Sequence, residues 1–120
     1  MARVTLEELR RGQAASAREV NEALTGWQDG IAQWWRFQVG HLQFILRFTK
    51  PNHKGNLHLI AEDCRFICGP TYWHNADVQV EHVETDDGYF VIRDSKAEFK
   101  VTCNYVIVAH DVEPVYEASI

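Results

Sequence analysis

Apolar positions near the start of the chain recur with the period of an α-helix. Thr5-x-x-Glu8 and Ser16-x-x-Glu19 each match a capping box, which satisfies free amide groups at a helix start. After the second box, apolar residues follow at helical spacing. They are Val20, Leu24, Trp27, Ile31 and Trp34. This pattern predicts one helix or a helix pair over residues 5–35.

From Trp35 the apolar period changes from about 3.6 to two, which is typical of strands. The segment 50–55 has the composition of a turn and separates two such runs. If Thr49 faces Asn56 across it, apolar side chains share one face of the hairpin. The expected pairs on that face are Phe48–Leu57, Leu46–Leu59 and Phe44–Ala61, and those on the other are Arg47–His58, Ile45–Ile60 and Gln43–Glu62. A one-residue slip would mix the faces, so the pattern favours this register or one shifted by two residues.

The second half of the chain predicts further short strands. Gly69-Pro70 ends a brief strand at 65–68, because Pro cannot donate to a central ladder. Asp87-Gly88 predicts a two-residue hairpin that pairs His82 with Arg93. Apolar residues keep one parity over residues 97–109, which favours one long curved strand over a hairpin.

Together these elements predict an α+β fold. An N-terminal helix or helix pair, about 5–35, packs on a strongly curved antiparallel β-sheet or partial barrel of six to eight strands. The helices precede the strands instead of alternating with them, and short turns join antiparallel neighbours. Apolar residues on both faces of the 78–93 hairpin suit strong curvature. At 120 residues the chain is expected to form a single domain, 1–120.

Charge and composition narrow the function classes. The net charge is −5, and twelve of the 17 acidic residues lie in residues 61–120. Binding to nucleic acid or to an anionic membrane surface needs clustered basic residues, and the sequence has no long basic stretch. We therefore expect neither partner. No apolar run reaches the roughly 20 residues of a membrane span, and the N-terminus lacks the pattern of a secretory signal. With three cysteines as reduced thiols, we expect a cytoplasmic protein.

Cysteine and histidine raise the question of a metal site. Cys64, Cys68, His74 and Cys103 match zinc ligands by residue type. On a strand, however, Cys64 and Cys68 lie about 13 Å apart at roughly 3.3 Å per residue, too far to share one ion. We therefore expect unpaired thiols, no metal and no cofactor.

A ligand pocket is a second hypothesis. Its candidate residues are Arg47, His58, Glu62, Trp73, His74 and His82. A histidine beside a carboxylate can transfer protons near neutral pH, which would allow acid–base chemistry. The alternative is a solvated sheet face with ordinary cross-strand pairs.

The leading hypothesis is a non-enzymatic binding or protein-interaction domain. No compact catalytic motif is present, and four tryptophans exceed the needs of a small core. A protein partner or self-association as a homodimer would fit. The alternative is a small-molecule-binding pocket protein, which includes an enzyme that uses His/carboxylate chemistry. The sequence leaves open whether the chain is an enzyme.

Overall fold

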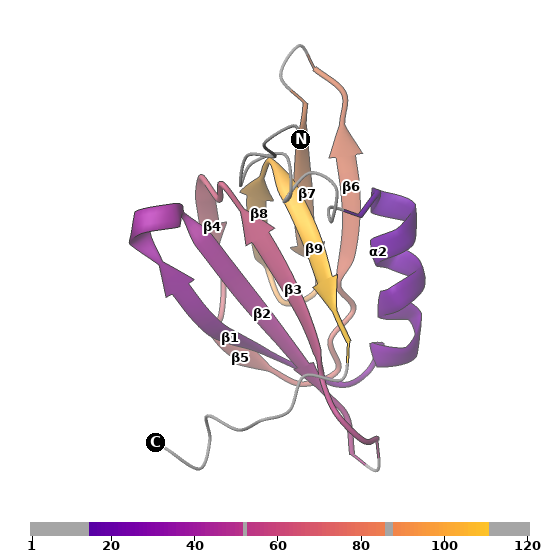
Figure 1. The fold of residues 1–120 in the computed structure, drawn as a ribbon. Coiled ribbons are helices and arrows are strands. Elements are labelled where there is room, and N and C mark those ends of the chain that lie inside the picture. The colour runs from indigo at the N-terminus through magenta and orange to yellow at the C-terminus, as the bar shows by residue number, and fades with distance from the viewer. Residues whose placement is uncertain (1–14, 52, 86–87, 111–120) are drawn as a thin grey trace, which may run out of the picture.

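The structure is a computed structural model that describes residues 15–51, 53–85 and 88–110. Within these ranges the chain forms a short α-helix, two 3-10 helices and nine strands (Figure 1). In chain order they are α2 (Ala17–Leu24), η1 (Thr25–Trp27), β1 (Ile31–Gln38), η2 (Val39–His41), β2 (Gln43–Thr49), β3 (Leu57–Glu62), β4 (Phe66–Cys68), β5 (Tyr72–Trp73), β6 (Gln79–Val83), β7 (Tyr89–Asp94), β8 (Phe99–Cys103) and β9 (Tyr105–Ala109).

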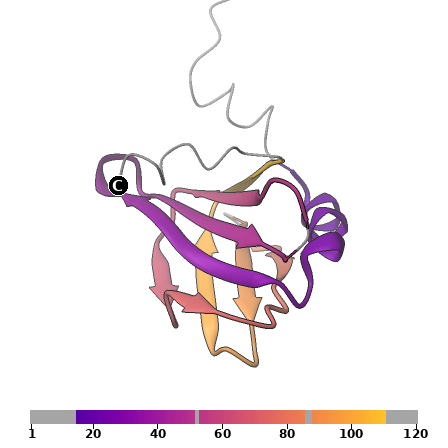
Figure 2. The same ribbon diagram turned by 90° about the horizontal axis from the view of Figure 1, so that it is seen from below.

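The strands form two antiparallel sheets. One has the order β5-β1-β2-β3-β9 and the other β4-β8-β7-β6. The helix α2 packs on β6 and β9, the edge strands at one side of the two sheets. Figure 2 shows α2 at this side and β4 and β5 at the opposite side. The predicted α+β character and antiparallel pairing are confirmed, but two sheets replace the expected single curved sheet of six to eight strands.

The core lies between the two sheets and under α2. Its fully buried large side chains are Val20, Leu24, Phe44, Leu46, Phe48, Leu57, Leu59, Val78, Ile92, Phe99, Val101 and Val106. Burial of each such side chain stabilises the fold by about 1.5–3 kcal/mol relative to exposure. Every layer contributes to this set, so the helix and both sheets depend on one another.

The predicted register of the first hairpin is confirmed. Strand β2 pairs with β3 through Phe48–Leu57, Arg47–His58, Leu46–Leu59, Ile45–Ile60 and Phe44–Ala61. The even-numbered residues of β2 are buried in the core, and the odd-numbered ones face outward. Of the two registers that alternation along the strand allowed, the structure has the one in which Phe48 pairs with Leu57.

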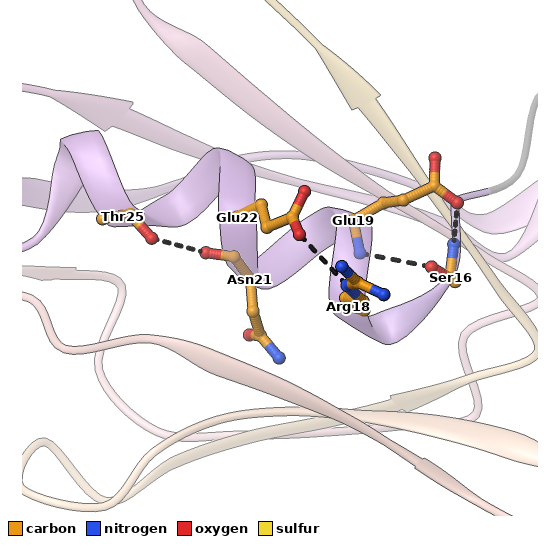
Figure 3. A network of polar contacts seen from close by, with 6 residues as sticks. All are labelled: Ser16, Arg18, Glu19, Asn21, Glu22 and Thr25. Carbon is orange, nitrogen blue, oxygen red and sulfur yellow. Dashed lines mark hydrogen bonds and ion pairs between the residues drawn. The ribbon is translucent and has the colours of Figure 1, made fainter.

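The helix start is also as predicted. The Ser16 hydroxyl accepts a hydrogen bond from the Glu19 amide, and the Glu19 carboxylate accepts one from the Ser16 amide, each at 3.2 Å (Figure 3). This is a complete capping box. The first predicted box, Thr5-x-x-Glu8, lies outside the described residues.

The helix is much shorter than predicted. It ends at Leu24 and, after η1, the chain turns into β1, so the expectation of helix up to residue 35 is wrong. Gly30 occupies this turn: a Cβ there would lie 2.6 Å from the Thr49 carbonyl oxygen. The β-branched and aromatic residues that follow fit a strand better than a helix. Their spacing of three and four was compatible with a helix only by coincidence.

Residues 97–109 form two strands in different sheets, separated by Asn104 alone. Cys103 is the last buried residue of β8, and Val106 is buried in β9, so the inward parity changes at this point. Opposite it, Asp63 has a positive φ of 55° and accepts a hydrogen bond from the Asn104 side chain. This paired bend carries the chain from one sheet to the other. The long strand that parity favoured is wrong. The alternative of two strands with a hairpin at Asn104 is right in the division at Asn104, but β8 and β9 lie in different sheets and form no hairpin.

The β6–β7 hairpin has a different register from the predicted one. Its closing pair is Val83–Tyr89, which leaves a five-residue connection instead of a two-residue one. His82 therefore faces Phe90, and Arg93 faces Gln79. In the observed register Val80 pairs with Ile92, and both side chains are buried in the core. Burial of this pair decides the register, against the two-residue turn that Asp87-Gly88 favours locally.

Candidate functional site

Three predicted site residues lie on the outer face of the five-stranded sheet. Arg47 extends from β2, and His58 and Glu62 from β3, all opposite to the core-facing residues. All three are nevertheless buried. A fully solvated sheet face, the alternative interpretation of these residues, does not describe this arrangement.

An aromatic side chain completes this cluster. Trp35 stands at an irregularity in the β1–β2 pairing, between Trp34 and Arg36, and its ring lies 4.3 Å from the Arg47 guanidinium. The His58 ring lies 6.3 Å from the Trp35 ring. Cation–π contacts of this kind contribute about 0.5–2 kcal/mol. Trp35 thus lies beside both Arg47 and His58, which face each other in the β2–β3 pair.

Burial determines the protonation of His58. Loss of solvent and, to a smaller degree, the nearby positive charge of Arg47 lower the pKa of His58 below its ordinary value. Its Nε2 atom is buried and makes no hydrogen bond to any described residue. His58 is therefore a neutral imidazole at neutral pH.

Glu62 lies at the other end of the same strand face. Its Oε1 accepts a hydrogen bond from the Gln43 side chain at 2.9 Å, as the predicted Gln43–Glu62 pair requires. Four residues along a strand separate it from His58 by about 13 Å. The sheet thus brings both residues to one face but not into a His–carboxylate pair.

Trp73 belongs to the core and not to this cluster. Its indole nitrogen donates a hydrogen bond of 2.8 Å to Asp94, which is buried. The same carboxylate accepts from the backbone amide of Asp77. Trp73 therefore joins β5 to the opposite sheet, a structural role.

The two remaining predicted histidines are exposed and lie elsewhere. His74 follows β5 and stands edge-on to Tyr72, with 5.3 Å between ring centroids. His82 lies on β6 in the other sheet and contacts Phe90 at 4.7 Å. Neither shares a site with His58.

The thiols are separate from these residues. Cys64 and Cys103 are buried and Cys68 is exposed, all three unpaired. Burial raises the pKa of Cys64 to about 11 and that of Cys103 further. In the described ranges no group of three or more histidine, cysteine or acidic residues is arranged to hold a metal ion.

Sequence reasoning missed a second surface. Within the described residues, four large apolar side chains are exposed: Phe37 by 38%, Val39 by 74%, Phe66 by 49% and Tyr72 by 50%. We call these four residues the apolar rim. The tryptophans drew attention in the sequence, but Trp27 and Trp73 are buried and Trp34 packs on the core. Only the strand order reveals that the rim residues share one side of the molecule.

Comparison with protein-family models, curated proteins and solved structures found no match. None of the helices in the described part of the chain has the length and apolar character needed to cross a membrane.

Proposed function

We propose that the protein is a non-enzymatic protein-interaction domain that receives an extended acidic segment of a partner on the side opposite α2. The observation that carries this proposal is the apolar rim. Its residues come from the C-terminal end of β1, η2, β4 and β5, and both ribbon views place these parts of the chain away from α2 (Figures 1 and 2). Exposed apolar groups gathered on one side are typical of interaction sites.

The backbone of β1 supports binding of the partner segment as an additional strand of the sheet. Strand β5 pairs with β1 only at Ala32 and Gln33. Residues 36–38 pair with β2 on one side and with no described strand on the other. Such an edge can accept an extended segment as an additional strand. Phe37 and Val39 would then contact the side chains of that segment.

The opposite side of the two sheets is closed to strand addition. The Asn21 side chain of α2 donates to the Val80 carbonyl oxygen at 2.7 Å and accepts from the Val80 amide at 2.8 Å. It thereby occupies the edge of β6 as a neighbouring strand would. The molecule thus has one covered side and one open side.

Charge favours an acidic partner. Arg36 is exposed on the open part of β1, and Lys100 is exposed with its ammonium 6.0 Å from the Phe66 ring. Although the net charge of the chain is −5, both cations lie next to rim residues, where acidic side chains of a partner could pair with them. A second copy that paired antiparallel through the same edge in the register centred on residue 36 would bring two Arg36 side chains together, and like charges in facing positions are destabilising.

Selection from a display library of short random peptides tests the proposal on the full chain. We expect enriched sequences in which acidic residues alternate with apolar ones. The double charge reversal Arg36→Glu, Lys100→Glu should weaken their binding at least tenfold. The exposed lysines Lys54 and Lys96 lie outside the rim, so the matched double reversal Lys54→Glu, Lys96→Glu should leave binding unchanged.

Two results would contradict this function. One is the failure to enrich acidic sequences, or equal binding by both double reversals. The other is a concentration-dependent dimer in sedimentation experiments that Val39→Asp abolishes, since the rim would then bind a second copy of the chain.

A further inference from the structure

The outer surface of the four-stranded sheet contains a concavity that none of the predicted site residues lines. Its volume is about 360 Å³, and its lining residues are Arg65, Tyr89, Thr102, Cys103 and Asn104. Small-molecule sites typically measure about 300–1,000 Å³. The concavity lies where β8 reaches the bend at Asn104, beside the starts of β4 and β7.

Strand alternation explains which side chains face the concavity. Phe90 and Cys103 form one cross-strand pair, and Val91 and Thr102 the next. Cys103 is buried in the core, so Thr102 points to the outer face. Tyr89, which precedes Phe90, points outward for the same reason.

Asp63 positions two of the polar groups. One of its carboxylate oxygens lies 2.8 Å from the Arg65 guanidinium, and the other accepts a hydrogen bond from the Asn104 side chain. The backbone amide of Arg65 also donates to the Thr102 carbonyl oxygen at 2.9 Å. These contacts orient Arg65 and Asn104 before any ligand binds, and Asp63 balances the charge of Arg65.

The polar groups that remain for a ligand include both hydrogen-bond donors and hydrogen-bond acceptors. The hydroxyls of Tyr89 and Thr102 can donate and accept, the Asn104 carbonyl oxygen accepts, and the remaining N–H groups of Arg65 donate. A carboxylate ligand only accepts, and it would approach Asp63. A neutral molecule rich in hydroxyl groups can use donors and acceptors alike, and the Tyr89 ring offers an apolar wall.

We propose that this concavity binds a neutral, hydroxyl-rich small molecule of monosaccharide size, with an apolar face of its ring against Tyr89. The proposal is independent of the protein-interaction function, because it rests on different residues. The site is open to solvent and makes few contacts, so we expect affinities in the millimolar range.

Titration of the full chain with methyl glycosides of glucose, galactose and mannose, followed by amide NMR spectra, tests this site. We expect saturable shifts at Arg65, Tyr89, Thr102 and Asn104 with at least one glycoside. Sodium benzoate at matched ionic strength should produce none there.

Matched variants make the result specific. Tyr89→Ala should weaken glycoside binding at least fivefold, whereas Tyr72→Ala, which removes an exposed tyrosine of the rim, should leave it unchanged. Thr102→Val removes a hydroxyl while it preserves the strand, and should also weaken binding if Tyr89→Ala fails to fold. No saturable shift with any glycoside, shifts with benzoate alone, or equal binding by Thr102→Val would each overturn the proposal.

Discussion

At the scale of single residues, His58 shows how a position on an outer strand face can still be buried. Its neighbours Arg47 and Trp35 surround the ring with a cation and an aromatic group. A charged imidazole in this position would be desolvated beside a like charge, and the neutral form avoids both penalties.

The lowered pKa of His58 predicts a loss of stability in mild acid. The unfolded chain takes up a proton near the ordinary pKa of about 6.5, whereas folded His58 does so only at lower pH. The contribution of His58 to the free energy of unfolding is therefore complete above about pH 6.5. It decreases as the pH falls toward the pKa of folded His58. Urea unfolding between about pH 8 and pH 5 should show this slope, and His58→Gln should reduce it.

The exposed His82 provides the control for this experiment. The variant His82→Gln should show the same pH dependence of the free energy of unfolding as the unchanged chain. Equal slopes for His58→Gln and the unchanged chain would contradict the role of His58.

At the scale of elements, α2 is held mainly through its contacts with the sheets. It has only eight residues, and isolated helices shorter than about 12–15 residues are marginal in water. Val20 and Leu24 are buried against the core, and Asn21 binds both backbone groups of Val80. These tertiary contacts determine the position of the helix.

Replacement of Asn21 measures the strength of this attachment. Asn21→Ala leaves the partly buried amide and carbonyl of Val80 without that partner, so it should destabilise the fold by about 1–3 kcal/mol in chemical denaturation. Glu22→Ala, on the exposed side of the same helix, should cost no more than about 0.5 kcal/mol. A similar cost for both variants would show that the Asn21 contacts do not stabilise the helix.

At the scale of the whole molecule, the bend at Asp63 and Asn104 joins the two sheets and encloses two thiols. Cys64 and Cys103 are buried beside this bend, whereas Cys68 is exposed on the edge strand β4. Reaction of the buried thiols thus requires a local opening of the fold at this bend.

Thiol alkylation should therefore distinguish surface reactivity from local opening of the fold. Near pH 8, Cys68 should react at the rate of a free surface thiol. Cys64 should react at least a hundredfold more slowly, because burial blocks access and raises its pKa to about 11. Cys103 should behave like Cys64. Mass spectrometry of the modified peptides measures each rate, and the difference should disappear in denaturant.

A Cys68→Ser chain should be almost inert to the reagent under native conditions. Rapid native modification of Cys64 or Cys103 in that chain would show that the bend opens easily, contrary to the expectation.

The sequence alone determined those structural features that depend on residues close together in the chain. The capping box at Ser16 and the facing of the β2 and β3 side chains followed from local spacing, since burial of one face excludes a one-residue slip of the register. The presence of Arg47, His58 and Glu62 on one sheet face followed from the same alternation. These features could be predicted because each is decided by residues close in sequence or joined by one hairpin.

Only the tertiary structure decided the rest. The segment 31–38 forms a strand instead of the predicted helix because its backbone pairs with β2 along its length and with β5 at Ala32 and Gln33, partners that local spacing cannot reveal. The chain passes between the two sheets at Asp63 and Asn104, which meet although they are 41 residues apart in the sequence. The apolar rim and the outer concavity unite residues from several strands. Such long-range contacts arise from packing of the whole chain, which no single local pattern encodes.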